Sequence, residues 1–487
     1  MYINDKILIG KTENFENIAI LPSMASRHGI ITGASGSGKT TTLKVMAESF
    51  SSCGIPSILI DVKGDLKGCA VKGDYDKVEK RVNDLKLENF DMQAFPVEFW
   101  DIYGKYGNRI RCKVKDLETR MLSKILLLND SQEEVLTIIL KIAEDKNLDI
   151  VDLEDLKEVT SHVYDNRLNY SKTYGNITSQ TISTIQRSIL TLKENGGDML
   201  FGEPSFEFKD FIKYSSNTGF GNINIIDATT LFKNPRLYAI VVLWLLSTLY
   251  DKLDEIGDTP KPRLVFFIDE AHLLFSEIDE RQVKQIIQIV KLIRSKGVGL
   301  YFISQSPSDI KEEILGQLGN KIQHTLRSYT KSDEKALKVA ASSFRINKDF
   351  DNEEVIRNLG TGEALVSFLN EKAEPSISMK VKILPPQSKM GTILPEECQE
   401  FVRKSRFFEK YEKEVESETA KDVLRREREK EKKEEENVKK EENVKKLSSV
   451  KKSTKRKTTA KDRVINSALS TIGRKIGNSI FKGIFKS

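Results

Sequence analysis

The chain has 487 residues, more than one ordinary globular core uses, so we expect two or three units. Its formal net charge of +6 is small for this length, and the basic excess lies near the C-terminus, so charge alone excludes no class of partner. The four cysteines lack the paired spacing of a zinc or redox site, and no basic stretch followed by an apolar run opens the chain. We therefore expect a cytoplasmic protein with reduced thiols and no secretory signal.

The first predicted elements open a parallel α/β sheet. Residues 28–32 form an apolar run typical of a buried strand. After a glycine-rich stretch, apolar residues recur at the spacing of one helix face, at Leu43, Met46, Ala47 and Phe50. A second apolar run, 55–60, ends at Asp61. This order of strand, loop, helix and strand predicts that residues 1–72 form the first part of an α/β core.

The middle of the chain, from about residue 73 to 215, changes to helical periodicity with many charges. We interpret residues 73–215 as a mostly helical subdomain inserted between early strands of the sheet. The most apolar stretch, 238–250, has 13 residues, well short of the ~20 needed to cross a bilayer. We therefore expect a buried helix there and no integral membrane segment.

The α/β core is predicted to resume over residues 216–386, where strand-like runs return at 222–226, 264–268, 298–304, 364–367 and 377–384. Residues 387–463 are rich in lysine and glutamate, which is typical of a solvated helix or a disordered linker. In residues 464–487 an apolar stripe recurs at helical spacing. This pattern predicts an amphipathic C-terminal helix that docks on a neighbouring subunit, on a membrane surface or on its own core.

The stretch 33–40 has the sequence GASGSGKT, which fits the phosphate-binding motif G-x-x-x-x-G-K-[ST], with a strand before it and a helix after it. Backbone N–H groups of such a loop and the helix N-terminus surround phosphates. Lys39 would reach the β- and γ-phosphates, and Thr40 would hold Mg²⁺. The predicted nucleotide contacts are Gly33, Ser35, Gly36, Ser37, Gly38, Lys39, Thr40 and Thr41.

A buried strand that ends in two carboxylates is the second sign of nucleotide chemistry. Residues 264–268 are continuously apolar, as in a strand buried on both faces, and Asp269 and Glu270 follow them. The end of such a strand lies at the carboxyl edge of the sheet, where ligands bind. We predict that Asp269 supports Mg²⁺ and that Glu270 orients and deprotonates the attacking water. The alternative is that both acids only begin the next helix.

Two further polar residues accompany the strand 298–304. Gln305 lies at its tip and could sense the γ-phosphate, although the pattern fits a first loop residue equally well. Arg294 ends the preceding helix, where an arginine commonly interacts with the helix dipole. The four histidines show no ligand spacing and are interpreted as structural. A guanine-selective N-K-x-D is missing, because Phe350 holds the fourth position of NKDF, so we expect ATP.

These motifs resemble those of the HerA/FtsK superfamily of DNA-pumping P-loop ATPases, in particular a bacterial HerA-like helicase group. The resemblance runs from about residue 20 to 386. The blocks LIRSKGVG (292–299) and LGNKIQH (318–324) are specific to that group, whereas GASGSGKT and LVFFIDE are generic to P-loop proteins.

The resemblance implies a RecA-like core that hydrolyses ATP at the subunit interfaces of a hexameric ring around duplex DNA. By matching position, it makes Arg294 an arginine finger offered to a neighbour's ATP, Gln305 a polar sensor and Arg327 a second phosphate-facing arginine. HerA proper carries an N-terminal β-barrel used in assembly and nuclease partnership. Only 32 residues precede Gly33 here, which leaves the end-resection role and a nuclease partner open.

Three functions stay open at this point. The first is a DNA translocase or helicase that contacts phosphates, since no helix-turn-helix or zinc module is recognisable. The second is a P-loop ATPase that moves or remodels protein, and the third is a regulatory ring ATPase that does not travel along DNA. Duplex DNA would stimulate hydrolysis only in the first case. Lys63 and Lys67, in a strand-end loop, are interpreted as DNA contacts in a pore or as solvated surface residues.

Overall fold

The computed structural model describes residues 1–328, 330–413, 415 and 417–450. The chain divides into a first unit, Met1–Lys421, and a second unit, Asp422–Ser487. All of the predicted nucleotide-binding residues belong to the first unit. The predicted amphipathic helix 464–487 lies outside the described residues, so its docking stays a prediction.

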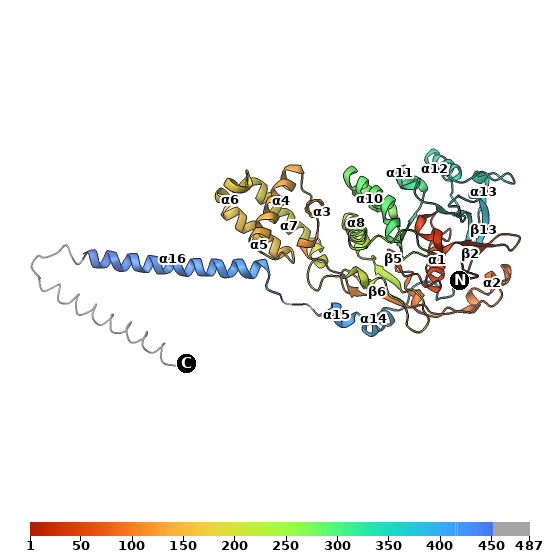
Figure 1. Ribbon diagram of the computed structural model, residues 1–487, viewed down its shortest axis with the longest axis horizontal. Helices are drawn as coiled ribbons and strands as arrows, with labels where there is room; N and C mark the ends of the chain where they lie inside the picture. Colours follow the sequence, from red (N-terminus) through yellow and green to blue (C-terminus); the bar gives the residue numbers. More distant parts are fainter. Residues whose placement is uncertain (329, 414, 416, 451–487) are drawn as a thin grey trace, which may run out of the picture. The chain divides into compact units, whose positions relative to one another are not determined.

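A single sheet runs through the first unit and contains thirteen strands among the described residues (Figure 1). Their order is β1-β2-β13-β12-β11-β4-β10-β9-β5-β8-β6-β7, and β3 pairs with β2. The eight strands from β11 to β7 are parallel, whereas β12, β13, β2, β1 and β3 pair in antiparallel fashion. The strands are β1 (Tyr2–Ile3), β2 (Lys6–Lys11), β3 (Asn17–Ile20), β4 (Gly29–Thr32), β5 (Ser57–Asp61), β6 (Val97–Asp101), β7 (Asn108–Arg109), β8 (Ile223–Asp227), β9 (Leu264–Ile268), β10 (Val298–Ser304), β11 (Asn320–Gln323), β12 (Glu363–Ser367) and β13 (Met379–Ile383).

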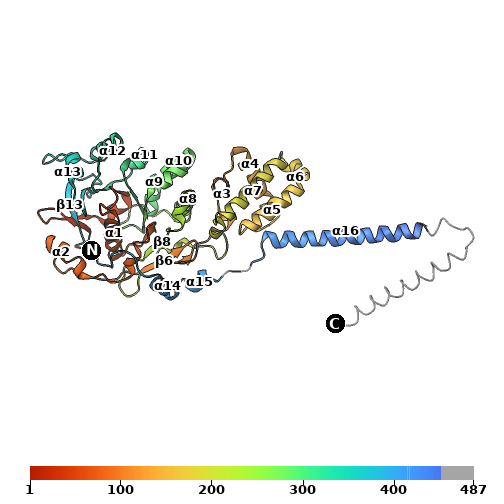
Figure 2. The same ribbon diagram turned by 180° about the vertical axis from the view of Figure 1, so that it is seen from behind.

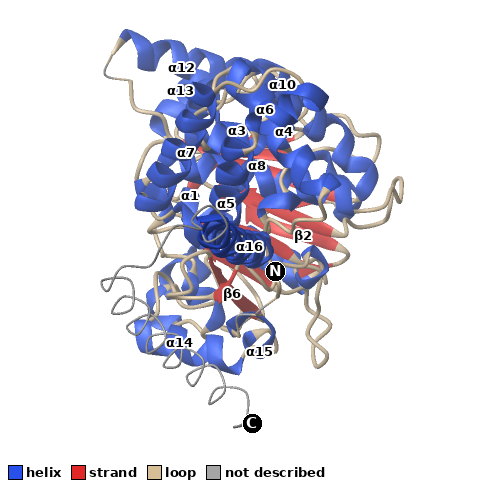
Figure 3. Ribbon diagram, turned by 90° about the vertical axis from the view of Figure 1, so that its left-hand side faces the viewer, coloured by secondary structure: helices blue, strands red, loops and turns tan. Residues whose placement is uncertain are grey.

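Helices cover both faces of the parallel strands, which explains why these strands are continuously apolar (Figure 3). Successive residues of a strand point to opposite faces. On one face, Phe267 and Tyr301 pack against Phe50 of α1 (Lys39–Ser52). On the other, Phe302 packs against Phe275 of α9 (Ala271–Glu277), and α9 contacts α8 (Pro235–Lys252). The helices that follow are α10 (Glu280–Leu292), α11 (Glu312–Leu315), α12 (Lys331–Ser342) and α13 (Asn352–Asn358).

The helical part of the expected insertion is shorter than residues 73–215. After α2 (Glu79–Asp84), the strands β6 and β7 belong to the main sheet. The helices that follow gather in a cluster of their own (Figures 1 and 2), made of α3 (Thr119–Ile125), α4 (Asp130–Asp145), α5 (Leu153–Asp165), α6 (Arg167–Tyr174) and α7 (Ser179–Glu194). The insertion therefore first completes the sheet and then adds the helices.

The apolar stretch 238–250 lies within α8, which is buried along most of its length. Asn234 begins this helix, because its side chain accepts a hydrogen bond from the Leu237 N–H at 3.2 Å, and Pro235 occupies the first helical position. In the part of the chain that the structure describes, no helix combines the length and the apolar character needed to span a bilayer.

The first unit extends past the expected boundary at residue 387. The short helices α14 (Pro395–Lys404) and α15 (Phe408–Glu412) pack beside β6 and β7. Trp100 of β6 lies 5.1 Å from the ring of Phe407 and 5.7 Å from that of Tyr411, measured between centroids. The charged stretch then forms α16 (Ala420–Val450), which carries ion pairs one turn apart such as Arg425 with Glu429.

Candidate functional site

The glycine-rich loop joins β4 to α1 and requires glycine at defined points. Gly33 and Gly38 have φ angles of +150° and +113°, which L side chains rarely adopt. A Cβ on Gly33 would lie 2.5 Å from the Cβ of His324, and one on Gly38 would lie 3.1 Å from the backbone N of Gly362. The loop can therefore turn tightly against its neighbours only because these two positions lack side chains.

Lys39 and two neighbouring strand ends hold the loop in this shape. The Lys39 ammonium donates to the carbonyl oxygens of Gly33 at 2.5 Å and Ala34 at 3.0 Å. The Gly33 N–H donates to the Gln305 carbonyl at 3.3 Å, and the Ala34 N–H donates to the Thr325 carbonyl at 2.8 Å. Burial lowers the pKa of Lys39. A phosphate in the loop would offer this ammonium a charged acceptor in place of two carbonyls.

His324 supports the loop from the end of β11. Its ring is buried and bridges two elements, since Nδ1 donates to the Glu363 carbonyl at 2.8 Å and Nε2 accepts from the Thr42 hydroxyl at 2.9 Å. Burial lowers the pKa of His324 to about 4, so the ring is neutral near pH 7. This histidine is structural, as the sequence predicts.

Asp269 and Glu270 follow β9 at the same sheet edge as the loop, because β9, β10 and β4 are parallel and in register. Both side chains are buried, and the Glu270 N–H donates to Asp269 Oδ1 at 2.9 Å. Glu270 adopts φ 46° and ψ 47°, a left-handed conformation that is rare outside glycine. Burial raises the pKa of Asp269 to about 7, and the neighbouring Glu270 carboxylate adds to this shift.

Thr40 and Asp269 are the predicted magnesium ligands, and Asp65 lies with them. Burial raises the pKa of Asp65, and contact with the Thr40 hydroxyl partly offsets this effect. The described residues hold no group of three or more His, Cys, Asp or Glu side chains that could bind a metal unaided. Mg²⁺ in nucleotide sites takes one or two protein ligands and completes its shell with phosphates and water. A hydroxyl and buried carboxyls beside a phosphate-binding loop fit such an ion.

Two basic side chains lie against the Glu270 carboxylate. Lys63 Nζ is 3.3 Å from Oε1, and His272 Nδ1 is 3.4 Å from Oε2. Within the described structure, neither that Oε2 nor that Nδ1 makes a hydrogen bond. Burial lowers the pKa of Lys63, but the carboxylates of Asp269 and Glu270 outweigh burial and raise it overall.

Lys67 behaves differently from Lys63, although the two share a loop. The Lys67 ammonium pairs with the Asp227 carboxylate at 2.5 Å, and both side chains are more than nine-tenths buried. It also lies 4.3 Å above the ring of Tyr106. Lys67 is therefore neither a pore contact nor a solvated residue, and both sequence interpretations are wrong. Its ammonium is buried and already paired with the Asp227 carboxylate.

The three predicted phosphate sensors lie in two places. Gln305 is exposed and adjoins the loop through its carbonyl. Arg327 is exposed two residues after Thr325, which also contacts the loop. Arg294 lies in the 3₁₀ turn η8 (Ile293–Lys296) before β10, at the opposite end of that strand. The seven residues of β10 span ~20 Å, so Arg294 is remote from its own loop. Its Nη1 lies 2.8 Å from Asp258 Oδ1.

A small cavity of about 190 Å³ adjoins the start of α1. Gly38 and Thr41 line it together with apolar residues such as Val78, Leu384 and Pro385. Arg81 of α2 also lines the cavity and donates to the carbonyls of Thr361 and Gly362, each at 3.2 Å.

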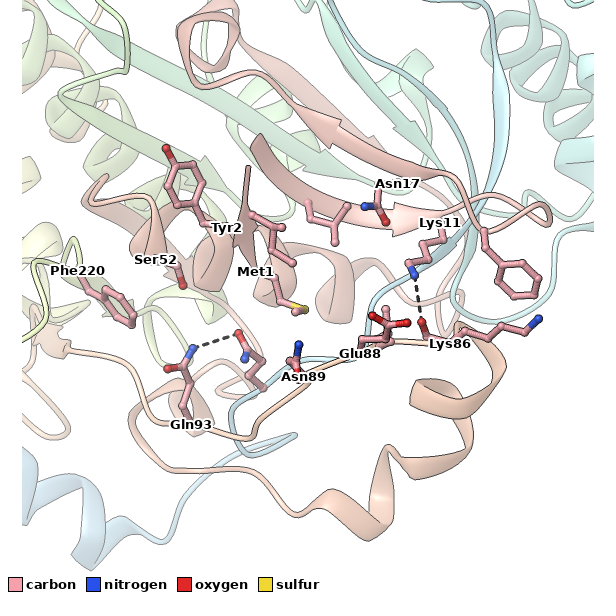
Figure 4. A pocket seen from close by; sticks show the side chains of 15 residues that line it. Met1, Tyr2, Lys11, Asn17, Ser52, Lys86, Glu88, Asn89, Gln93 and Phe220 are labelled. Atoms are coloured by element: carbon pink, nitrogen blue, oxygen red, sulfur yellow. Dashed lines mark hydrogen bonds between the residues drawn. The ribbon is translucent and has the colours of Figure 1, made fainter. Parts of the chain in front are cut away.

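A cavity of about 750 Å³ lies elsewhere, between the N-terminal strands and the segment before β6 (Figure 4). The Lys11 ammonium donates to the backbone carbonyl of Lys86 at 3.2 Å, and the Gln93 side chain donates to Gln387 Oε1 at 3.1 Å. The predicted site residues all belong to the described part of the chain, and none lines this cavity. We assign it no role in nucleotide chemistry.

Sequence reasoning missed the surroundings of Glu270 and the small cavity. Lys63 and Asp65 follow the strand-end Asp61 by two and four residues, so their nearness to the carboxyl edge of the sheet could have been predicted. His272 follows Glu270 by two residues. Arg81 offered no signal, because it reaches the loop only through the packing of α2 near β12.

The glycine-rich loop on β4, the buried acids after β9 and the intervening strand β10 define a RecA-like P-loop ATPase, which confirms the predicted fold class. The chain belongs to the family described as helicase HerA-like C-terminal, whose model matches residues 6–487. The predicted membership of the HerA/FtsK superfamily is thereby confirmed.

Named relatives agree with this family. The DNA double-strand break repair helicase HerA of Saccharolobus solfataricus is 26% identical over 365 residues, which are 74% of this chain and 64% of that protein. The chain thus spans less than two thirds of that relative's length. The protein of the same name from Pyrococcus furiosus is 24% identical over 417 residues, 75% of this chain and 68% of the relative.

Solved structures share the fold at low identity. VirB4 of Thermoanaerobacter pseudethanolicus has a TM-score of 0.51 and 16% identity, over 78% of this chain and 97% of that one. The bacterial conjugative coupling protein TrwB has a TM-score of 0.50 and 13% identity, over 80% and 93%. These likenesses concern the fold alone.

Proposed function

We propose that this chain is an ATP-hydrolysing motor that acts on duplex DNA as a ring of identical subunits, with six as the expected number. Membership of the HerA-like family and the names of its helicase relatives support the DNA substrate. The observation that supports the ring is the position of Arg294 at the end of β10 opposite its own loop, so that an arginine finger at this position would have to act on a nucleotide bound to another subunit.

The roles of the residues follow from their places at the sheet edge. Lys39 and the N–H groups of the loop bind the phosphates of ATP, and Thr40 with Asp269 holds Mg²⁺. Glu270 takes a proton from the attacking water. Gln305 and Arg327, on the neighbouring strand ends, are proposed to contact the γ-phosphate. A TrwB structure of similar fold, with a TM-score of 0.50, contains ADP and Mg²⁺.

The small cavity beside α1 is the proposed place of the adenine base. It adjoins Thr41, one residue past the magnesium-binding Thr40, and its far wall is largely apolar. A flat aromatic base fits between such a wall and the backbone of a helix start. Arg81 donates to the carbonyls of Thr361 and Gly362 and thereby fixes the position of these two lining residues.

The deciding experiment measures ATP turnover with and without linear duplex DNA, together with particle size. We expect DNA to raise turnover, and we expect this stimulation to fall with salt, because contacts to phosphates release counterions. Turnover that ignores duplex DNA would instead favour the alternatives, an ATPase that moves protein or a regulatory ring. No observation here favours either of them over the DNA motor.

A further inference from the structure

The loop after β5 points one lysine at the catalytic glutamate. Asp61, the last residue of β5, accepts hydrogen bonds from the Gly64 N–H at 2.7 Å and the Leu66 N–H at 3.1 Å. These bonds fold residues 61–66 into a tight turn whose tip is Lys63. Within residues 61–70, all of which the structure describes, Lys63 is the only exposed residue.

The Lys63 side chain therefore contacts the site and is also partly exposed to solvent. Its side chain is 48% exposed, whereas that of Glu270 is 10% exposed. The Lys63 ammonium lies 3.3 Å from Oε1 of Glu270, so the two side chains form a partly exposed ion pair. His272 lies against the other carboxylate oxygen. A carboxylate paired with the Lys63 ammonium through Oε1 is poorly placed to turn toward a water molecule at the γ-phosphate.

We propose that Lys63 is a positioning residue that restrains Glu270 while no DNA is bound, and that a phosphate of the DNA backbone draws Lys63 away and frees the glutamate. The proposal rests on the proposed function, because it takes duplex DNA as the source of the phosphate. Its physical basis is a competition between two anions, one carboxylate and one phosphodiester, for the same ammonium group.

A DNA phosphate can displace the Glu270 carboxylate from the Lys63 ammonium, because the ion pair between the two side chains is weak. Partly exposed ion pairs are weak, and solvent reaches the Lys63 ammonium. A DNA backbone presents many phosphates at once and gains further from counterion release. The buried pair of Lys67 and Asp227 in the same loop is not open to this exchange, because DNA cannot reach it without unfolding the loop. Exposure thus separates the switching lysine from the structural one.

The test compares wild type, Lys63→Gln, Lys63→Arg and Lys141→Gln in steady-state ATP turnover with and without duplex DNA. Lys141 is a matched control, because its side chain is 53% exposed, close to the 48% of Lys63, and it pairs with Glu144 in the helical cluster. We expect Lys63→Gln to raise the DNA-free kcat by about threefold to tenfold, with little change in KM, and to lose most of the DNA stimulation. Lys63→Arg should preserve the restraint, and Lys141→Gln should behave as wild type.

A double variant checks that Lys63 acts through Glu270. The rise in DNA-free turnover should vanish in Lys63→Gln combined with Glu270→Gln. A DNA-free kcat of Lys63→Gln that equals or falls below that of wild type would overturn the restraint, whether or not DNA stimulates the wild type. A wild type that ignores DNA, while Lys63→Gln is still faster, would overturn the DNA motor and support the restraint alone. Thermal melting of each variant shows that the fold is intact.

Discussion

Lys39 and Glu270 lie at one sheet edge but act at different stages of the proposed reaction. Lys39 contacts the loop carbonyls where phosphates would bind, whereas the Glu270 carboxylate lies against Lys63 and His272. Interactions with the ground state change binding, and those made only in the transition state change turnover. The two residues should therefore separate in kinetics.

We predict that Lys39→Ala weakens ATP binding by about tenfold to a hundredfold, the effect of removing a charge-assisted hydrogen bond. Glu270→Gln should keep near wild-type ATP binding and lower kcat by about 10²-fold to 10⁴-fold, as expected for loss of a general base. Nucleotide titration by fluorescence and single-turnover hydrolysis measure the two effects. Glu144→Gln, at an exposed acid of the helical cluster that pairs with Lys141, is the control, and wild-type turnover in Glu270→Gln would contradict the assignment.

The strand β10 connects two sites that serve different subunits in the proposed ring. Its carboxyl end meets the glycine-rich loop through Gln305, and its amino end follows Arg294. A rigid buried strand holds these two groups at a set separation, so one subunit cannot bring both to one nucleotide. A neighbour that stacks its amino edge on this carboxyl edge would supply the missing arginine.

We predict that inactive Arg294→Ala and inactive Glu270→Gln subunits regain activity when mixed, because one class of mixed interface has both residues intact. An arginine finger contributes about 10³-fold or more to turnover, so partial recovery is measurable. Arg281→Ala, on the preceding α10, is the matched control, and this variant should hydrolyse ATP without being mixed with another variant. Lack of recovery in rings shown by sedimentation to be mixed would leave Arg294 a structural residue paired with Asp258.

Stability of the whole molecule depends on buried titratable groups far from solvent. His28, before β4, accepts from the Leu300 N–H at 3.0 Å and donates to the Val290 carbonyl at 2.8 Å, so it ties α10 and β10 together. Burial lowers the pKa of His28 from 6.5 to about 4. Asp61 and Asp269 shift the other way, since burial raises the pKa of each to about 7.

These shifts act on stability with opposite signs. A lowered histidine pKa stabilises the fold above pH 6.5, and this contribution is lost as the pH falls toward 4. The raised aspartate pKa values favour the fold as the pH falls below 7. We predict that His28→Gln lowers the free energy of unfolding at pH 7. The difference in this free energy between wild type and variant should be smaller by ~2 kcal/mol at pH 5. Urea unfolding at both pH values measures the gap, and a constant gap would contradict a neutral buried His28.

The sequence by itself determined the loop, the acidic strand, the buried α8 and the α/β class, because each depends on neighbours a few residues apart. Periodicity and motif spacing are local properties, so they can be identified in the sequence without knowledge of the fold. The sequence also separated the helical cluster from the core, although it placed β6 and β7 with the helices, since Glu98 interrupts the apolar run of β6 and β7 has only two residues.

Only the tertiary structure decided which distant residues share the site. Lys63 and Lys67 are four residues apart and chemically alike, yet one faces Glu270 and solvent while the other is buried against Asp227. The sheet order brings β5 beside β9 and so places the turn after Asp61 at the catalytic glutamate. The same order puts Arg294 at the edge opposite its own loop. Strand order and burial depend on contacts between residues hundreds of positions apart, which no local pattern records.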